Sequence, residues 1–420
     1  MKITGVSGRE IFDSRGFPTI ECQLELEDGS TVIASVPAGA SKGTNEAKEM
    51  RDGGERLFGL GVSKAINILE EKIAPILIGK NPDVVEADLA MLEADGTVHK
   101  SNFGGNTILA ASIAVARAQA FVEQMPLYEL LAVLCDYDAV SVPFPLFNFI
   151  NGGLHADNNF PIQEILVIPV GDSTFRACLE SAIYLFYTFK KILQSAGKRA
   201  LVGDEGGFAP IFENEEEALT LLVDAMKVAK LEKDYDYFLA MDVAATELYD
   251  PETKLYSWSG KKLTSNQLID KYEKLMEKFP MYALEDGMAE FDEEGWRALN
   301  ERLGESTSIV ADDLTVSNPE LINKAIQENI ANTFIIKPNQ IGTVTQALQA
   351  ITMCKEKDYG VIVSHRSGET NDTFIADLAV GTSSGHIKAG GPTRGERMIK
   401  YNHLLRTEDT LMLQLLGAAL

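Results

Sequence analysis

The chain has 420 residues, of which 45% are hydrophobic and 24% are charged, a balance that excludes a disordered or fibrous protein. Sixty-two acidic against thirty-eight basic residues give a formal net charge of -24, which disfavours binding to nucleic acid or to anionic membranes. The length predicts two domains, and the charge implies that an anionic substrate would need cations or metal ions in its pocket.

The cysteines indicate the redox environment. They are far apart, form no CxxC pair, and belong to a chain large enough to fold without disulfides: Cys22, Cys135, Cys178 and Cys354. We therefore expect reduced thiols in a cytoplasmic protein. Residues 1–5 begin no apolar leader, and the longest apolar stretch, 107–122, is short and contains Arg117. We expect neither export nor a membrane span.

The first segment, residues 3–36, alternates apolar and polar side chains and carries Asp28-Gly29 between two runs. This pattern predicts a β-hairpin. In segments 61–78 and 106–122, apolar residues recur at three- and four-residue intervals, which is typical of helices. We predict a small α+β domain over residues 1–136.

From residue 137 onward, short apolar runs end in a charged or polar residue and precede an amphipathic helix. The runs end at Asp242, Glu285, Asp312, Lys337, His365 and Lys388. The last five endpoints follow one another at 23 to 28 residues, the length of one strand-plus-helix unit. Such units predict parallel strands, and their number favours an eight-stranded α/β barrel over residues 137–420. Spacing alone leaves a doubly wound sheet open, but no GxGxxG motif supports the dinucleotide-binding alternative.

Two helices in this region carry start signals. Thr264 precedes Gln267 by three residues, as in a capping box. Ser317 stands in the same relation to Glu320, with Pro319 in the first turn. We predict that helices begin at these two positions.

Three strand-end acids, Asp242, Glu285 and Asp312, would project into one cavity, where carboxylates repel each other unless a cation joins them. Their hard oxygen ligands indicate magnesium. For any one acid alone, a helix cap or an ion pair is the better interpretation, but not for three together. We expect Asp286 and Asp313 to be the helix caps, because they lie closer to the helix starts.

Lys337 ends an apolar run before Pro338, so we expect its side chain to reach the same cavity. Nearby cations would disfavour its ammonium form, lower its pKa and make it a base at neutral pH. A structural ion pair with one of the acids is an equal alternative for Lys337. The same two interpretations apply to Lys388.

Three further segments offer polar groups. His365-Arg366-Ser367-Gly368-Glu369 places a planar cation and a hydroxyl beside a glycine, which suits a phosphate. The loops 151–158 and 203–207 combine glycines with His155 and Glu205, as a closing lid and a general acid require. Plain turns are the alternative for such glycine pairs.

Several long strings, in order along nearly the whole chain, resemble motifs of the enolase family. They are GREIFDSRGFP, NGGLHADNN, QEILVIPVG, GDEGGFAP, EDGMAEFDEEGW, ADDLTVSN, IKPNQIGT and SHRSGETNDTFIADLAVGT. The resemblance implies a lyase that interconverts 2-phosphoglycerate and phosphoenolpyruvate in glycolysis. It also implies an N-terminal α+β domain and an eight-stranded barrel that begins irregularly, ββαα, before its regular βα units.

The resemblance implies a role for each matched residue. Asp242, Glu285 and Asp312 would hold the first of two magnesium ions, and Ser41 would join the second. Lys337 would be the catalytic base, and Glu205 the acid that helps hydroxide leave, with Glu164 beside it. The remaining implied substrate contacts are His155, Gln163, His365, Arg366, Ser367 and Lys388. The family also implies a homodimer or a higher homo-oligomer, and we expect Arg15 and Glu21 to face Arg406 and Glu408 of a second subunit.

The sequence departs from the family pattern at Phe17, Ala38 and Lys42. Because Lys42 adjoins Ser41, we predict that it weakens the second magnesium site or contacts the substrate phosphate instead. Two alternatives stay open: an enzyme for a related phosphonate or phosphorylated hydroxy acid, and an enolase-like binding protein with weak catalysis. The joint presence of Lys337, Glu205 and three acids argues against a role in binding alone.

Overall fold

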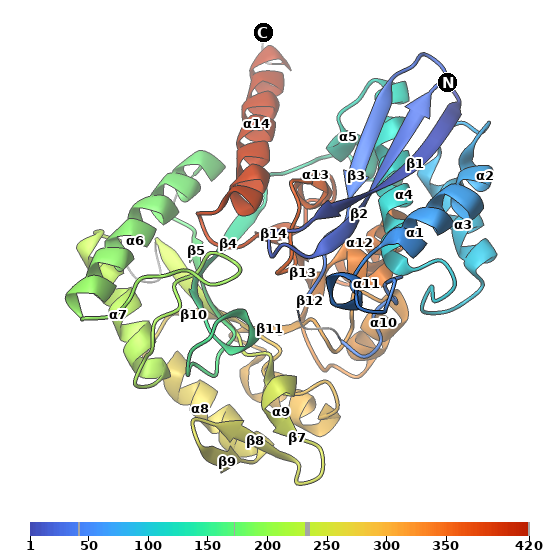
Figure 1. Cartoon of the computed structure of the whole chain (residues 1–420). Coiled ribbons are helices and arrows are strands. Elements are labelled where there is room, and N and C mark those ends of the chain that lie inside the picture. The colour runs from blue at the N-terminus through green and yellow to red at the C-terminus, as the bar shows by residue number, and fades with distance from the viewer. Residues whose placement is uncertain (41–42, 172, 232–235, 419–420) are drawn as a thin grey trace.

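The computed structural model describes residues 1–40, 43–171, 173–231 and 236–418. A three-stranded sheet with its helices forms one part, and a barrel surrounded by helices forms the other (Figure 1). This arrangement confirms the predicted fold class. None of the helices within the described residues combines the length and the apolar character needed to cross a lipid bilayer.

The N-terminal sheet consists of β1 (Ile3–Phe12), β2 (Pro18–Leu26) and β3 (Thr31–Ser35), paired antiparallel in that order. The predicted hairpin turn is present between β2 and β3. Asp28 Oδ1 accepts a hydrogen bond from Ser30 N at 2.9 Å, and Gly29 has a φ of 82°, which an L side chain rarely adopts. The alternating pattern of β2 buries Ile20, Cys22 and Leu24 against α4.

The helices of this domain follow the sheet. The predicted helix over 61–78 is divided into α1 (Ser63–Ile68), a π-helical turn (Leu69–Ile73) and α2 (Ala74–Leu77). A short 3-10 turn, Arg56–Gly59, precedes them, and α3 (Val84–Asp95), α4 (Gly105–Glu123) and α5 (Leu127–Leu134) follow. Helix α4 is apolar on nearly every side, and it is accordingly buried between the sheet and the barrel.

The barrel closes in the order β4-β5-β6-β10-β11-β12-β13-β14. Its strands are β4 (Phe144–Asn151), β5 (Glu164–Pro169), β6 (Tyr237–Asp242), β10 (Met281–Glu285), β11 (Ser308–Ala311), β12 (Thr333–Ile336), β13 (Gly360–Ser364) and β14 (Gly385–Lys388). Eight apolar side chains fill its interior. Strand β5 contributes two of them, β14 contributes none, and each of the other strands contributes one: Leu146, Leu166, Ile168, Ala240, Ala283, Val310, Ile335 and Ile362.

One strand corrects the expectation of parallel strands throughout. β5 runs antiparallel to both β4 and β6, whereas the other neighbours in the barrel are parallel. Helices α6 (Phe175–Ser195) and α7 (Glu215–Val228) then follow before β6. This ββαα start confirms what the family resemblance implied and what the spacing of strand endpoints could not indicate.

The remaining helices surround the barrel or line its rim. They are α8 (Ser265–Met276), α9 (Glu293–Leu303), α10 (Pro319–Gln327), α11 (Pro338–Ile341), α12 (Val344–Glu356), α13 (Phe374–Gly381) and α14 (Gly395–Ala418). Two 3-10 turns, Gly153–His155 and Ala245–Leu248, lie in loops. A small antiparallel sheet of β7 (Tyr249–Asp250), β8 (Leu255–Trp258) and β9 (Lys261–Leu263) precedes α8.

One of the two predicted helix caps is present in the structure. The capping box at the start of α8 is confirmed, because Thr264 and Gln267 exchange side-chain-to-backbone hydrogen bonds. The prediction for Ser317 was wrong by one residue, since Asn318 caps α10 by accepting from Glu320 N at 2.9 Å. The Ser317 hydroxyl instead donates to Gln340 Oε1 and accepts from Lys337 N, inside the barrel rim.

Polar contacts fix the N-terminal domain on the carboxyl rim of the barrel. The Arg117 guanidinium makes two hydrogen bonds of 2.7 Å to Asp372, and Thr345 N donates to Asp88 Oδ2 at 2.9 Å. Ala38 forms a β-bridge with Gly368, which lies directly after the predicted phosphate-binding pair. The segment before residue 41 is therefore held over the site.

Candidate active site

The carboxyl rim of the barrel gathers the predicted side chains. Asp242, Glu285 and Lys388 end β6, β10 and β14, while Asp312, Lys337 and His365 directly follow β11, β12 and β13. Glu164 begins β5, and because this strand is antiparallel, its first residue pairs with Asp242 on the same rim. Each of the carboxylates and histidines at this rim is at most 5% exposed.

The three strand-end acids already face cationic side chains. Lys388 Nζ lies 3.0 Å from Asp242 Oδ2, 2.8 Å from Glu285 Oε2 and 3.0 Å from Glu164 Oε2. Lys337 Nζ pairs with Asp312 Oδ2. Burial, followed by the charge of Asp242, raises the pKa of Glu285 well above its ordinary value. The arrangement therefore concentrates negative charge that only nearby cations can compensate.

Lys337 departs from the expected electrostatics. We predicted a pKa lowered by neighbouring cations, but in the structure its pKa is raised above its ordinary value. Burial is the largest single effect and lowers the pKa, but the neighbouring carboxylates, Asp312 first and then Glu285, together outweigh it. The predicted lowering assumed a cation beside the ammonium, whereas here a carboxylate faces it.

Asp286 and Asp313 do not cap helices, so that prediction was wrong. Asp286 accepts hydrogen bonds from Asp312 N at 3.0 Å and from Asp313 N at 3.1 Å. Helix α9 is instead capped by Asp292. Oxygen atoms of Asp286, Asp312 and Asp313 lie within 4.8 Å of one another, and burial together with the charge of Asp312 raises the pKa of Asp313 to about 8.

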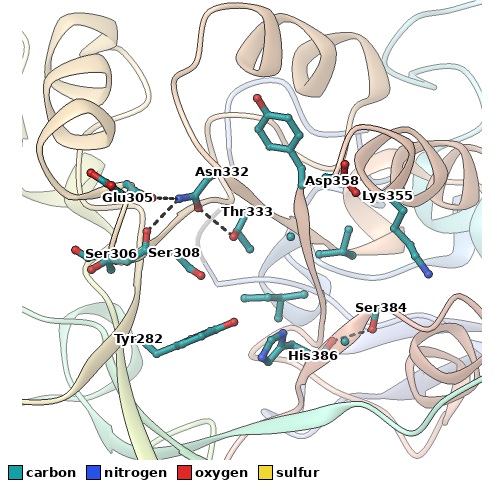
Figure 2. A pocket seen from close by; sticks show the side chains of 17 residues that line it. Tyr282, Glu305, Ser306, Ser308, Asn332, Thr333, Lys355, Asp358, Ser384 and His386 are labelled. Carbon is teal, nitrogen blue, oxygen red and sulfur yellow. Dashed lines mark hydrogen bonds between the residues drawn. The ribbon is translucent and has the colours of Figure 1, made fainter. Parts of the chain in front are cut away.

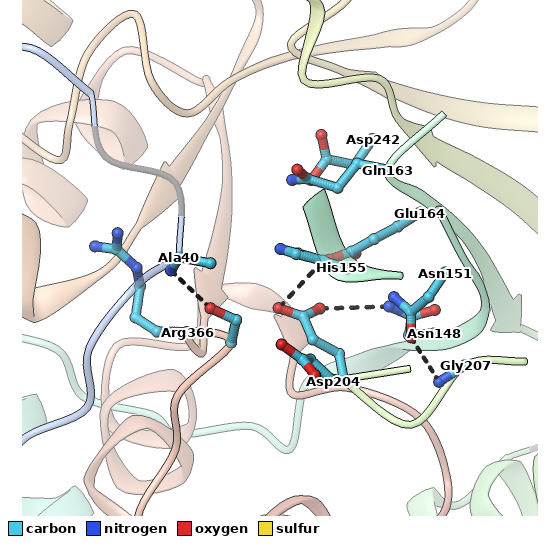
Figure 3. Close-up of polar contacts among 12 residues, drawn as sticks. Ala40, Asn148, Asn151, His155, Gln163, Glu164, Asp204, Gly207, Asp242 and Arg366 are labelled. Atoms are coloured by element: carbon cyan, nitrogen blue, oxygen red, sulfur yellow. Dashed lines mark hydrogen bonds and ion pairs between the residues drawn. The ribbon is translucent and has the colours of Figure 1, made fainter. Parts of the chain in front are cut away.

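A second cluster joins the two glutamates and a histidine. His155 Nδ1 lies 3.2 Å from Glu164 Oε1 and 3.6 Å from Glu205 Oε1. Asn148 Nδ2 donates to Glu205 Oε2 at 3.3 Å, and His365 Nε2 lies 3.3 Å from the same oxygen. Figure 3 shows Asn148, His155 and Glu164 gathered on one side of the site, with Ala40 and Arg366 on the other.

The two glutamates of this cluster differ in proton affinity. Burial, then the charge of Glu205, raises the pKa of Glu164 to about 7. Burial acts in the same direction on Glu205, but the charge of His155, together with hydrogen bonds from Glu164 and His365, outweighs it and holds the pKa of Glu205 well below the ordinary value. Although burial disfavours its cation, the Glu205 carboxylate raises the pKa of His155. One proton shared by the pair therefore resides mainly on Glu164 at neutral pH.

The predicted phosphate-binding residues contact the N-terminal domain. Ser367 Oγ accepts hydrogen bonds from Ala40 N at 2.8 Å and from Arg15 Nη1 at 3.3 Å. The Arg366 guanidinium pairs with both carboxylate oxygens of Glu46, at 3.1 and 3.2 Å. Gly39 packs so closely on this guanidinium that a Cβ there would lie 1.8 Å from Nη2. The Arg366 guanidinium is thus held between Gly39 and Glu46, the two end residues of the segment 39–46.

Comparison with protein families decides the relationship. The model of the enolase N-terminal domain matches residues 3–131, and the model of the enolase C-terminal TIM barrel domain matches residues 139–416. The chain belongs to the enolase family. Its barrel is therefore related to those of the lyases of the enolase superfamily.

The rim offers oxygen donors for the magnesium that the enolase family implies. Three buried carboxylates, Asp242, Glu285 and Asp312, supply hard oxygen donors, and the Lys388 ammonium lies between the first two. Because Asp242 and Glu285 both face the Lys388 ammonium, the same two carboxylates could also face a divalent cation. Gln163, the residue before β5, donates from Nε2 to Asp242 Oδ2 at 3.5 Å. Asp242 and Glu285 therefore offer oxygen donors that suit magnesium, whereas the oxygens within 4.8 Å of those of Asp312 belong to Asp286 and Asp313.

Ser41, which we expect to join the second magnesium ion, and its neighbour Lys42 lie outside the described residues. The other departures are placed. The Arg15 guanidinium lies 5.5 Å from the centre of the Phe17 ring, and Ala38 N donates to Gly368 O at 2.8 Å. Neither Phe17 nor Ala38 is among the residues that line the site cavity.

Sequence reasoning missed several residues of this enolase-family site. Asn148 and Asn151 lie within the apolar strand β4, and Asn151 Oδ1 holds the loop of Glu205 by accepting from Gly207 N at 3.0 Å. Polar residues inside an otherwise apolar run were the signal that could have identified them. Glu46 and Arg397 had no local signal, because their partners are 320 and 32 residues away.

The site is not the roomiest hollow of the molecule. A cavity of about 20 Å³ is lined by residues of both clusters, whereas one of about 670 Å³ opens at the amino ends of β11 to β14. Figure 2 shows this second cavity, where Asn332 Nδ2 donates to Gly304 O and Thr307 O. The Asn332 amide is thus already hydrogen-bonded within the protein. Among the described residues, no cluster of buried charged side chains lines this cavity. We assign the chemistry to the smaller cavity.

Proposed function

We propose that this member of the enolase family catalyses the reversible dehydration of 2-phosphoglycerate to phosphoenolpyruvate. One observation carries the proposal: a single cavity is lined by a lysine, by a pair of glutamates that share a proton and by a guanidinium. These residues are Lys337, Glu164, Glu205 and Arg366. Proton abstraction, protonation of a leaving group and recognition of a phosphate are the three tasks that this reaction requires.

In the proposed reaction, Lys337 first gives up its ion pair with Asp312 and loses its own proton to solvent. The amine then takes the proton from the carbon beside the substrate carboxylate. The electron pair of that C–H bond forms the carbon–carbon double bond as hydroxide leaves the neighbouring carbon. The Glu164–Glu205 pair gives its shared proton to the hydroxide, so that water is released. When bound by Asp242, Glu285 and Asp312, magnesium would supply positive charge for the substrate carboxylate as its negative charge grows.

Arg366 and Ser367 would bind the phosphate of the substrate, since a guanidinium and a hydroxyl match its oxygens. Glu46 keeps the guanidinium in a fixed orientation before the substrate arrives. Lys388, between Asp242 and Glu285, would hold the substrate carboxylate near the acids that would otherwise repel it. His155 lies between the two glutamates and would influence which of them holds the shared proton.

The test is the growth of enol phosphate absorbance from 2-phosphoglycerate with magnesium, paired with exchange of the α-proton in deuterium oxide. We expect Lys337→Ala to abolish exchange, and Glu205→Gln to slow dehydration by about 100- to 10,000-fold while leaving exchange measurable. Lys324→Ala, which removes an exposed lysine from α10, is the matched control. Normal exchange by Lys337→Ala would refute the base assignment, and no absorbance growth by the wild type would refute the substrate.

We also propose a homodimer or a higher homo-oligomer. Three of the four expected contact residues bond within the chain: Arg15 donates to Ala38 O at 3.0 Å, Glu21 Oε1 accepts from Arg9 Nη1 at 3.5 Å, and Glu408 accepts from Arg176 N at 3.0 Å. Of the four, Arg406 is exposed, so the proposal rests mainly on this residue. A sedimentation measurement that finds monomers at micromolar concentration would contradict it.

A further inference from the structure

Arg397 lies in the first turn of α14 and is completely buried. Its Nη1 donates to Arg366 O at 2.7 Å and lies 2.7 Å from His365 Nδ1. Its Nη2 donates to Asp204 O at 3.1 Å and to Ser367 O at 2.5 Å. The four terminal N–H groups of the guanidinium thus meet four different acceptors.

This geometry determines the tautomer of His365. A guanidinium is protonated at every relevant pH and can only donate, so the Nδ1 atom that it faces must present a lone pair. A hydrogen on Nδ1 would place two donors 2.7 Å apart. Burial lowers the pKa of His365 to about 4, which keeps the imidazole neutral, and a neutral imidazole without hydrogen on Nδ1 carries it on Nε2.

The Nε2–H group then faces Glu205. Its Nε2 atom lies 3.3 Å from Glu205 Oε2, the oxygen that also accepts from Asn148 Nδ2. An oxygen that faces two N–H donors is a poor position for a proton. The other oxygen, Oε1, faces His155 at 3.6 Å and is the one left to exchange a proton.

We propose that Arg397 is a positioning residue that holds His365 in its Nε2-protonated tautomer, so that Glu205 takes up and releases the proton that it shares with Glu164 through Oε1. The inference rests on the proposed function, in which Glu205 belongs to the proton-donating pair. Gly390 completes the seat of Arg397, because a Cβ at this position would lie 2.6 Å from Arg397 Cδ. A fixed tautomer is the function that outer hydrogen bonds serve for many catalytic imidazoles.

The direct test is the ¹⁵N–¹H correlation spectrum of the substrate-free full chain, labelled at the nitrogens of histidine. The chain has five histidines, and the signal lost in His365→Gln identifies the one of interest. We expect a single neutral imidazole with hydrogen on Nε2 at pH 7. A hydrogen on Nδ1, or on both nitrogens, would overturn the inference without the need for an Arg397 variant.

Variants then test the cause. We expect Arg397→Met to show both tautomers and a kcat lowered by about ten- to a hundredfold, and Arg397→Lys to recover the Nε2-protonated form in part. Lys400→Met is the control, because Lys400 is another buried cation of α14 whose Nζ donates to Thr370 O at 2.7 Å. It should destabilise the fold and leave the tautomer unchanged.

If Arg397→Met folds and keeps one Nε2-protonated tautomer and the wild-type kcat, Arg397 only joins loops and the proposal fails. If Arg397→Met does not fold, the same two readings on Arg397→Lys decide, since unchanged values with a shortened donor would overturn the positioning role. Because the tautomer is measured without substrate, absence of 2-phosphoglycerate turnover would refute the proposed function and leave the tautomer result standing.

Discussion

Asp88 in α3 should make the stability of the protein depend on pH through the contact between its two domains. Its carboxyl is completely buried, accepts from Thr345 N of the barrel at 2.9 Å, and has Lys100 near it. Burial raises its pKa from 3.8 to about 6. The folded state therefore binds the proton more tightly than the unfolded chain does, and stability is lost as pH rises through this interval.

The magnitude follows from linkage. With a pKa of 3.8 unfolded and about 6 folded, ionisation of Asp88 costs the folded state about 1.6 kcal/mol at pH 5 and about 3 kcal/mol at pH 8. Asn at this position does not titrate. The stability of Asp88→Asn relative to wild type should therefore rise by about 1.4 kcal/mol between pH 5 and pH 8. Its absolute stability depends also on whether the new amide finds an acceptor, so the change with pH is the diagnostic quantity.

Urea unfolding of both proteins at pH 5, 6, 7 and 8 measures this difference. Glu93→Gln removes an exposed carboxylate from the same helix and controls for the loss of one negative charge. If the free energies of unfolding of wild type and Asp88→Asn change in parallel with pH, to within about 0.3 kcal/mol, burial does not perturb Asp88 and the reasoning is refuted.

Two further predictions concern the charges of the site. Lys388→Met leaves Asp242 and Glu285 without the ammonium between them, so the free energy of unfolding without magnesium should fall by about 3 to 5 kcal/mol. Magnesium should then raise the Tm of this variant more than that of wild type, and an equal rise would show that the ion does not bind at these acids. Lys42→Thr should lower the magnesium concentration for half-maximal activity if Lys42 repels the second ion, and raise KM if Lys42 binds phosphate. If neither quantity changes, Lys42 has no part in the mechanism.

The sequence predicted the residues of the rim because the signal is local: an apolar run followed at once by a charged side chain, as at Asp242 or Lys337. It did not predict the direction of β5, since the apolar run EILVIP carries no information on strand polarity. Asp286 was misinterpreted for a related reason. The backbone N–H groups that it accepts from belong to the end of the neighbouring strand, not to the helix that follows it.

Contacts across the fold escaped prediction altogether. Glu46 meets Arg366 because the N-terminal domain folds over the rim, and Arg397 meets His365 because α14 returns to the same place. Each pair is a long-range consequence of packing, and in the sequence Glu46 and Arg397 do not differ from ordinary surface charges. For Lys337 the sequence left a base with a lowered pKa and an ion pair with one of the acids equally open. The structure shows the ion pair, and which carboxylate the flexible side chain reaches could not be predicted.

The reversed strand β5 has a consequence for how this site can change over generations. In a parallel unit, a strand can slide or be replaced while its rim loop is rebuilt, because the loop leads onward to a helix. Here Asn151 and Glu164 are register partners in one hairpin, and His155 lies in the loop that joins them. A single inserted residue within either strand would turn Glu164 away from the cavity. Insertions between residues 156 and 160 would spare that register, so natural variation in length should concentrate there.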